Sequence, residues 1–503
     1  MKTSKRIFSG GMAVIMLVTC LIFSVSASGS NVLSQTDWNA YWQTVEGDNT
    51  MSVLTPGSDI SCLNVSWHSD SSAITGVVRI SKSRDMHEFK EFTGASLIDS
   101  YTGQRVYQVT VSGLEENTVY YYTYGSNGKF SAPQEYRTLS ADEFKVIYII
   151  DIQIGGEDAT GTKLRNEAYN WQKVLGTALD NNNDISFIIS AGDQTQNGDS
   201  ADEWIGTLSL SPAALRSYPM ATVVGNHDKK GDSYTYYVNN PNEYRGTTPM
   251  KLGKDYWFRY GDVLFLVYNT QCFNMYDQYH FTQDAIAQNE DATWRIAIMH
   301  HDIYGTGHHA ADNDNAILAA AYSAILDKFE IDVCLTGHEH LYGRSYFMEN
   351  DQLIKNQEYD ESGAVIDPEG IIYFTANSAS NKQRIPEEPY DYDWLEFSYI
   401  TDEPIYSTIE FSEKTFTLKS YTTDSNKLID ECKIIKTDTS YTPVDPDYKG
   451  MDTNMLERYF GEWYIIIEVL GYVVKAVAVI APKAAEIIVK AIKYLVPIII
   501  DML

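Results

Sequence analysis

Cysteine and positive charge are both scarce in this sequence of 503 residues. Its five cysteines are scattered and lack the CxxC or Cys/His spacing of a zinc finger, so neither a disulfide framework nor a structural zinc site is indicated. Lys and Arg number 38 against 68 Asp and Glu, which gives a formal net charge of −30 at pH 7. This charge repels phosphate backbones and excludes nucleic-acid binding through a general basic surface. An anionic ligand would need a local positive feature that overrides the field of the whole protein.

Apolar and aromatic residues are abundant by contrast. Hydrophobic residues make up 44% of the chain and aromatic residues 13%. Such a chain can bury large cores, so disorder along its whole length is excluded. At roughly 150 residues per domain, the length predicts about three domains.

The N-terminus has the pattern of an export signal. Three basic residues lie within the first six positions, an uncharged apolar segment covers residues 7–26, and small residues at positions 25 and 27 predict cleavage after Ala27. We therefore expect residues 1–27 to be a signal peptide and the mature protein to be secreted and extracellular. Two alternatives are a retained membrane anchor and a lipoprotein modified at Cys20, which the preceding Thr19 disfavours.

The C-terminal segment, residues 451–503, differs in composition from the rest of the chain. It is nearly neutral, and a helical wheel groups its charged residues, among them Glu468 and Lys475, into a narrow polar stripe on an apolar surface. This pattern predicts one or two amphipathic helices after a linker at residues 437–450. Three interpretations stand: membrane or cell-envelope contact, packing or oligomerisation, and a single span at residues 463–481. The cost of two charges near the bilayer centre argues against the span.

Residues 50–140 show short alternating segments bounded by turn residues, for example 63–67, 76–80 and 107–111. Strands at this spacing, without a helical pattern, predict a β-sandwich. Residues 114–122 resemble the tyrosine-corner strand of fibronectin type III-like sandwiches. The domain is interpreted first as a structural lid beside the next domain, and second as a recognition module.

From about residue 143 to 436 the pattern changes to that of an α/β domain. Residues 164–179 and 316–329 read as helices between strands. Five apolar segments each end in polar residues, at Asp151, Asp193, Asn226, His300 and His338. Because buried parallel strands deliver such residues to one edge of a sheet, these positions predict a functional site there.

Histidine is concentrated in the same loops. Seven of the ten histidines follow predicted strands, namely His227, His300, His301, His308, His309, His338 and His340. Imidazole and carboxylate ligands suit Zn, Fe or Mn, and a shared Asp can bridge two cations about 3.5–4 Å apart. Two divalent cations would exceed the charge of two Asp side chains, so the pocket would be cationic inside an acidic protein.

The motifs in these loops resemble those of the calcineurin-like metallophosphoesterases, and in particular the purple acid phosphatase branch, in which a fibronectin-like domain precedes the catalytic domain. They are Asp151-Ile152-Gln153, Gly192-Asp193, Gly225-Asn226-His227-Asp228, His300-His301-Asp302-Ile303-Tyr304 and Gly337-His338-Glu339-His340. Five motifs in this order form a specific signal, although any one alone is weak.

The resemblance implies a role for each position. Asp151 and His340 correspond to ligands of the first metal, and Asp193 to the bridging ligand. Ligands of the second metal correspond to Asn226, His300 and His338. His227 is similar to a non-ligand histidine that contacts phosphate and protonates the leaving oxygen, with Asp228 expected to orient it. Phosphate-contacting positions of lower specificity are His301, His308 and His309.

Two departures from the family pattern concern the metals. Gln196 stands where purple members have the Tyr that binds ferric iron, so we expect no tyrosinate colour. Gln153 stands where many metallophosphoesterases have a histidine ligand, and its amide oxygen would be a weak ligand that favours harder metals such as Mn or Mg. The cofactor is therefore expected to be two divalent metal ions, with Mn, Fe and Zn as candidates.

The leading functional hypothesis is a secreted phosphoesterase that hydrolyses phosphate monoesters by attack of metal-activated water. The alternatives are a phosphodiesterase acting on nucleotides or lipids, and a non-catalytic envelope protein with a degenerate metal site. Specificity is expected from the aromatic-rich segments 271–281 and 389–397, or from polar residues after the apolar segment 371–374, which are Asn377, Ser378, Lys382 and Arg384.

Overall fold

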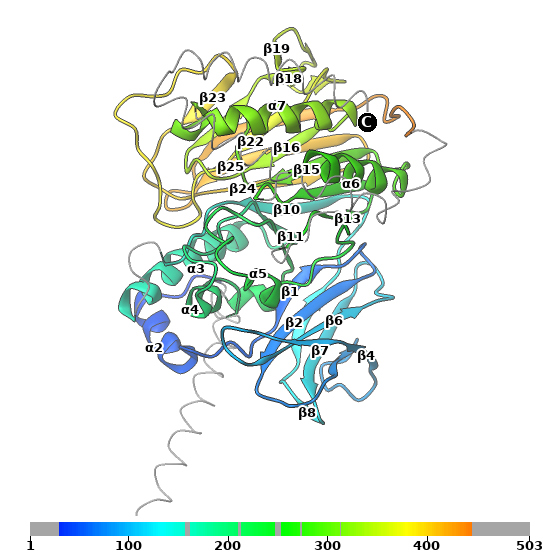
Figure 1. Ribbon diagram of the computed structural model, residues 1–503, viewed down its shortest axis with the longest axis vertical. Helices are drawn as coiled ribbons and strands as arrows, with labels where there is room; N and C mark the ends of the chain where they lie inside the picture. Colours follow the sequence, from blue (N-terminus) through cyan, green and yellow to red (C-terminus); the bar gives the residue numbers. More distant parts are fainter. Residues whose placement is uncertain are drawn as a thin grey trace, which may run out of the picture.

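The computed structural model describes residues 30–155, 161–209, 213–246, 253–271, 274–311 and 313–444. The predicted signal peptide and the predicted C-terminal helices lie outside these ranges. Within them, no helix combines the length and the apolar character needed to cross a membrane. Figure 1 shows a β-rich domain at the lower right and a larger α/β domain above it.

The N-terminal domain consists of two antiparallel sheets. The first has the order β1 (Val53–Pro56), β2 (Leu63–Ser69), β6 (Arg105–Val111), β5 (Ser96–Ile98). The second has the order β4 (Lys90–Gly94), β3 (Gly76–Ser81), β7 (Val119–Ser126), β8 (Lys129–Phe130), with β9 (Gln134–Arg137) also paired to β7. The strands predicted at 63–67, 76–80 and 107–111 are confirmed as β2, β3 and β6.

Both sheets contribute side chains to one core, which explains the alternating sequence pattern. Trp67 and Tyr107 come from the first sheet, and Val78 and Tyr122 from the second. In addition, Glu115 N donates a hydrogen bond to Tyr120 Oη at 2.8 Å, which is the contact that characterises a tyrosine corner. The domain is therefore β-rich as predicted, and its fibronectin type III-like identity remains a prediction.

The α/β domain contains two large sheets. The first has eight strands in the order β12 (Met220–Thr222), β11 (Ile185–Ser190), β10 (Phe144–Ile149), β24 (Ile405–Phe411), β25 (Thr415–Thr422), β26 (Leu428–Ile435), β21 (Val365–Ile366), β20 (Glu358–Tyr359). The second has seven in the order β13 (Tyr256–Tyr260), β14 (Val263–Tyr268), β15 (Trp294–Met299), β16 (Val333–Thr336), β22 (Ile372–Thr375), β17 (Tyr342–Ser345), β23 (Leu395–Tyr399). A separate hairpin pairs β18 (Phe347–Glu349) with β19 (Gln352–Ile354).

Helices cover the outer faces of both sheets, and an apolar core lies between the sheets (Figure 1). On the first sheet lie α2 (Gln35–Val45) and α3 (Thr162–Asn181), and on the second α6 (Met275–Ala287) and α7 (Asn313–Lys328). Shorter helical segments are α4 (Ala201–Trp204), a π-helix (Ile205–Ser209), α5 (Tyr234–Tyr237) and 3₁₀ turns at Ala213–Arg216 and His308–Ala311. The helices predicted at 164–179 and 316–329 are confirmed as α3 and α7.

Parallel strands place the predicted site. The first sheet contains three neighbouring parallel strands, β10, β11 and β12. The second contains four, β14, β15, β16 and β22. Their carboxyl ends therefore meet at one end of the two-sheet core, where the loops with the predicted ligands begin.

Helix α2 was not predicted, although its signal is present in the sequence. Ser34 Oγ accepts a hydrogen bond from Asp37 N at 3.2 Å and so caps the helix. Apolar side chains then follow at helical spacing and are buried, namely Trp38, Tyr41, Trp42 and Val45. Trp38 Nε1 donates to Arg165 O in α3 at 2.9 Å, so this segment packs on the α/β domain although it precedes the β-rich one.

The beginning of the predicted linker is also packed. Tyr441 Oη donates to Asp332 Oδ2 at 2.5 Å. Two cationic groups contact its ring, Arg295 Cζ at 3.7 Å and Lys436 Nζ at 4.5 Å from the ring centroid. Thr442 makes two hydrogen bonds of 2.8 Å to the Glu330 carboxylate. Residues up to 442 are thus fixed to the α/β domain, while residues 445–450 lie outside the described ranges.

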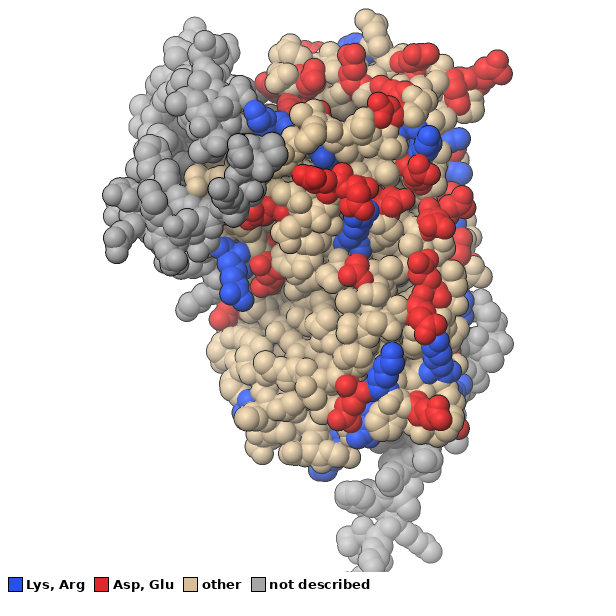
Figure 2. All heavy atoms as spheres, turned by 90° about the vertical axis from the view of Figure 1, so that its right-hand side faces the viewer, with Lys and Arg blue, Asp and Glu red and all other residues tan. Residues whose placement is uncertain are grey.

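Acidic side chains are spread over the surface. On the face drawn in Figure 2 they gather at the top right and along the right-hand side, with fewer basic side chains between them. This agrees with the strongly negative net charge. An anionic ligand could therefore bind only where a local cationic pocket offsets that charge.

Candidate metal centre

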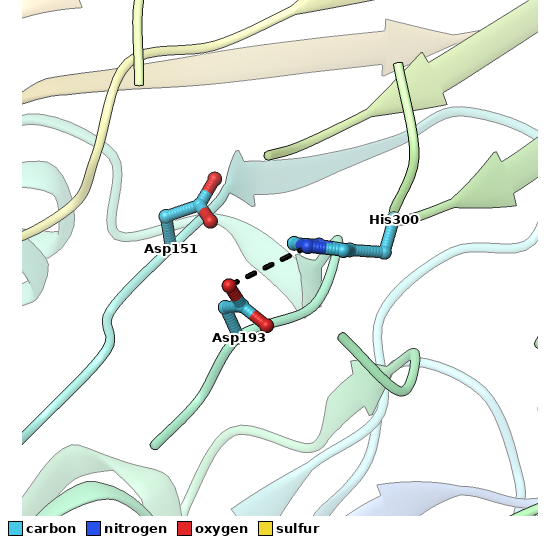
Figure 3. A group of neighbouring side chains, drawn as sticks. All are labelled: Asp151, Asp193 and His300. Atoms are coloured by element: carbon cyan, nitrogen blue, oxygen red, sulfur yellow. Dashed lines mark ion pairs between the residues drawn. The ribbon is translucent and has the colours of Figure 1, made fainter. Parts of the chain in front are cut away.

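Three of the predicted ligands lie together at the carboxyl ends of three strands. Asp151 follows β10, Asp193 follows β11 and His300 follows β15, and all three are buried. One ligand atom from each lies within 4.8 Å of the others. Figure 3 shows the three side chains pointing toward one another, with His300 Nε2 and Asp193 Oδ2 3.5 Å apart.

The three remaining ligands of the predicted set surround this cluster. Asn226 Oδ1 lies 2.9 Å from His300 Nε2, and His340 Nε2 lies 3.3 Å from Asp151 Oδ1. The His338 backbone N donates to Asp151 Oδ2 at 2.9 Å, and the ring centroids of His338 and His300 are 5.1 Å apart. These six predicted ligands therefore converge on one place, although five loops of the chain supply them.

Two of the imidazoles are oriented by backbone carbonyls. His300 Nδ1 lies 2.9 Å from Ala191 O, and His340 Nδ1 lies 2.6 Å from Lys382 O. Because a carbonyl only accepts, each Nδ1 carries the proton, and each Nε2 presents a lone pair to the cluster. Metal-ligating histidines are typically held in this way.

The Nε2 atoms of His300 and His340 face oxygen atoms of Asn226 and Asp151, which are also acceptors. A cation between such atoms would satisfy both. Among the described residues, Asp151 Oδ1 is buried and receives no hydrogen bond, while His340 Nε2 faces it. Burial opposes a charge on His300, yet the Asp193 and Asp151 carboxylates raise the pKa of its imidazole to about 9. The site therefore strongly favours positive charge, and its oxygen and nitrogen donors suit Zn, Fe or Mn.

The backbone at these positions is strained. Asp151, Gln153, Asp193, His338 and His340 have φ values of 48°, 45°, 51°, 79° and 56°. Non-glycine residues rarely adopt positive φ, and such strain is concentrated at functional sites. The turns bring the ligands inward directly after their strands, and Gln153 N donates to Asp193 O at 2.8 Å to connect two of these loops.

Motif glycines allow the loops to approach the ligands. A Cβ atom at Gly192, which has a φ of 98°, would overlap the His300 imidazole, and one at Gly225 would overlap the Asp193 carboxylate. The Gly-Asp and Gly-Asn-His motifs thus have a steric cause as well as a chemical one.

His227 lies beside the cluster, but its partner is not the predicted one. Its backbone N donates to Asp193 Oδ1 at 2.9 Å, and its Nδ1 lies 2.9 Å from Gln196 Nε2. Asp228 instead accepts hydrogen bonds from Gly225 N at 2.9 Å and Thr195 N at 3.0 Å. The expectation that Asp228 orients His227 is therefore corrected: Asp228 stabilises the loops, and Gln196 contacts the imidazole.

Burial and the neighbouring Asp193 carboxylate raise the pKa of Asp228 to about 7. The Asp193 charge thus acts on the Asp228 carboxyl, although that carboxyl is hydrogen-bonded to backbone N atoms of the loops. Gln196, at the position of the iron-binding Tyr in purple members, lies within hydrogen-bonding distance of the His227 imidazole, a contact that the sequence did not predict.

A cationic rim lies on the His338 side of the cluster. The His309 ring stacks on that of His338, with centroids 4.4 Å apart, and Arg384 Nη1 lies 3.0 Å from His309 Nε2 and 3.5 Å from His308 Nδ1. His301 Nδ1 lies 2.7 Å from Thr270 Oγ1, and its ring centroid is 5.1 Å from that of His338. Burial, followed by the positive charge of these neighbours, lowers the pKa of His338 well below its usual value.

Two specificity predictions are corrected by the structure. Asn377 is fully buried, and its Oδ1 accepts from Ser378 N at 2.7 Å, so it supports its own loop. Ser378 Oγ in turn donates to Asp151 O at 2.7 Å. Most of the segment 271–281 forms α6, in which Tyr279 and Phe281 pack into the core, and Gln271 Nε2 reaches the rim, 3.5 Å from His301 Nδ1.

Two buried carboxyl groups next to the ligands were also missed. Glu339 lies between two ligands in sequence, and burial together with the Asp302 charge raises its pKa to about 8. Burial likewise raises the pKa of Asp302 to about 7, although hydrogen bonds from Thr375 and Thr336 oppose the shift. Both residues lie within the histidine motifs, and this position in the sequence could have indicated that they lie beside the ligands.

Two family models match the chain in this order. Residues 49–138 match the purple acid phosphatase N-terminal domain, and residues 151–342 match the calcineurin-like phosphoesterases. The α/β domain therefore belongs to the calcineurin-like phosphoesterases, a family of metal-dependent phosphatases. Within it, the N-terminal domain identifies the purple acid phosphatase-like branch, as predicted from the motifs.

One solved structure supports this fold. The purple acid phosphatase PPD1 from yellow lupin (Lupinus luteus) seeds is similar with a TM-score of 0.61 and 14% identity, over 79% of this chain and 77% of that chain. GAP50, described as the anchor in the inner membrane complex of Plasmodium, matches with a TM-score of 0.40 and 14% identity, over 62% of this chain and 99% of that chain. No curated protein matches the chain.

Proposed function

We propose that this protein is an exported phosphomonoesterase with two divalent metal ions. The observation that carries the proposal is the buried group formed by Asp151, Asp193 and His300, with its lone pairs directed at one another and further donors around it. Two bound cations would polarise a phosphate and supply hydroxide near neutral pH.

The side chains around this group have complementary tasks. Asp193 accepts a hydrogen bond from His227 N, which holds the His227 imidazole at the edge of the cluster, where it is partly exposed. From there it can give a proton to the departing oxygen. The rim of His309, Arg384 and His301 adds donors and positive charge for the phosphate oxygens.

Export rests on the sequence of residues 1–27. The basic start, the apolar segment and the small residues before the cleavage position are the pattern of a signal peptide. Membrane or envelope contact through residues 451–503 is part of the same proposal. A chain truncated after residue 450 should lose partition with membranes or cell wall, and equal partition would refute that part.

The test is phosphate release by purified protein loaded with Mn, Zn or Fe. Phosphate monoesters should be hydrolysed, and Asp193→Asn should lower kcat by several orders of magnitude, because a carboxylate that would hold the metals is lost. Asp142→Asn, which changes an exposed carboxylate, is the matched control and should keep full activity. Absence of hydrolysis of every ester, together with no effect of Asp193→Asn, would reject the proposal.

The same experiment separates the alternatives. Hydrolysis of a diester such as bis(4-nitrophenyl) phosphate with higher kcat/KM than the monoester would favour a phosphodiesterase. Calorimetric titration of metal into apoprotein distinguishes the non-catalytic protein, which should bind one weak equivalent or none, from the enzyme, which should bind two.

A further inference from the structure

Three aromatic rings form a stack in the loop between β22 and β23. The ring centroids of Tyr390 and Tyr392 are 5.7 Å apart with 7° between the planes, and those of Tyr392 and Trp394 are 4.6 Å apart with 10°. All three residues are half-buried. The chemistry derived above uses none of them.

Hydrogen bonds fix the stack to the loop that leads from His300 to the rim. Trp394 Nε1 donates to Gly305 O, and Tyr392 Oη donates to Gly307 O, both at 2.9 Å. On the other side Tyr346 N donates to Trp394 O at 2.9 Å, and the Trp394 ring contacts Tyr304. The rings are therefore held in place before any ligand arrives, which lowers the entropy cost of binding.

The stack lies beside the segment that leads into His308 and His309 of the cationic rim. The two segments run in opposite directions: Trp394 bonds to Gly305, and Tyr392, two residues earlier in the chain, bonds to Gly307, two residues later. His309 lies two residues beyond Gly307, at most about 7 Å along the chain, and the same register continued by two residues would set Tyr390 opposite His309. His309 stacks on His338 and contacts Arg384, so the segment that holds Tyr392 leads directly into the cationic rim.

Resting on the proposed function, we propose that this stack, with Tyr390 at its outer end, binds the leaving group of the substrate. The substrate class is then a phosphomonoester whose leaving group carries an aromatic ring, such as an aryl or nucleoside monophosphate. A ring added to the stack gains the attraction that offset aromatic pairs show at these separations. Exposed acidic residues of the same loop disfavour additional phosphates, namely Glu387, Glu388, Asp391 and Asp393.

Benzyl phosphate and cyclohexylmethyl phosphate form the appropriate pair of probes. Both release a primary alcohol, and they differ in whether the ring is aromatic. The full chain should have the higher kcat/KM for benzyl phosphate, and Tyr390→Leu should reduce the benzyl to cyclohexylmethyl ratio about fivefold. Tyr390→Phe should retain the ratio. Phe89→Leu, an exposed aromatic residue of the β-rich domain, is the matched control and should leave the ratio and the activity unchanged.

A binding measurement separates this inference from the proposed function. Benzylphosphonate and cyclohexylmethylphosphonate are not hydrolysed, so calorimetry on the metal-loaded full chain needs no turnover. Benzylphosphonate should bind about fivefold more tightly, even if no ester is hydrolysed. Equal affinity of the two phosphonates for the unmodified chain, or a kcat/KM ratio unaffected by Tyr390→Leu, would overturn the subsite while hydrolysis of monoesters stands.

Discussion

Replacement of Gly192 by Ala changes no predicted ligand, yet it should impair metal binding. Gly192 has a φ of 98°, and a Cβ atom there would overlap the His300 imidazole. The backbone conformation alone should lower the free energy of unfolding by about 1–2 kcal/mol. To avoid the overlap, His300 must move away from Ala191 O, which fixes its orientation. Loss of such a supporting contact typically lowers metal affinity by about 10–100-fold.

The matched control is Gly128→Ala. Gly128 also has positive φ, 75°, but a Cβ atom there would meet nothing within 4 Å. Both variants should therefore show the backbone cost in thermal unfolding without metal, and only Gly192→Ala should lose affinity in a calorimetric titration of Mn or Zn into apoprotein. Equal metal affinity of the two variants would refute the placement of His300 as a ligand.

Three further predictions concern other parts of the chain. Tyr441→Phe removes the hydroxyl bonded to Asp332 and should lower the free energy of unfolding by about 1.5–3 kcal/mol, measured in urea; no change would mean that the segment after 436 is not fixed. Tyr120→Phe leaves Glu115 N without its partner and should cost about 1 kcal/mol in the same assay, whereas an unchanged midpoint would contradict the tyrosine corner. Burial raises the pKa of Asp255 to about 8, so the folded state holds a proton that the unfolded chain releases near pH 4. The free energy of unfolding should consequently fall as pH rises from about 4 to 8, and fall less in Asp255→Asn; identical pH profiles would refute this.

Strand positions and the convergence of the candidate ligands were predictable because both depend on local patterns. Apolar segments that end in Asp151 or His300 indicate buried strands followed by ligands, and the parallel order of β10 and β11 brings those ends together. Six predicted ligands converge for this reason.

Partner choice within the loops was not predictable. Asp228 follows His227 directly, but the turn directs its carboxylate to backbone N atoms of Gly225 and Thr195, so Gln196 is left to contact the imidazole. Asn377 also has a polar side chain after a strand, yet it is directed into its own loop. Such outcomes depend on loop conformation, which residue type and spacing do not determine.

Helix α2 was missed for a different reason. Its spacing and N-cap are visible in the sequence, but it lies before the β-rich domain and packs on α3 of the following one. If domains are assigned in chain order, the segment before the β-rich domain has no neighbouring element on which to pack. Its apolar helical face was therefore not recognised.

The central claim is a catalytic pair of metals, and the most direct measurement is phosphate release as metal is added stepwise to apoprotein. Activity on a monoester should stay low up to one equivalent of metal and rise to its maximum as the second equivalent binds, with Asp193→Asn inactive throughout. Full activity at one equivalent, or two bound equivalents without phosphate release, would contradict the account.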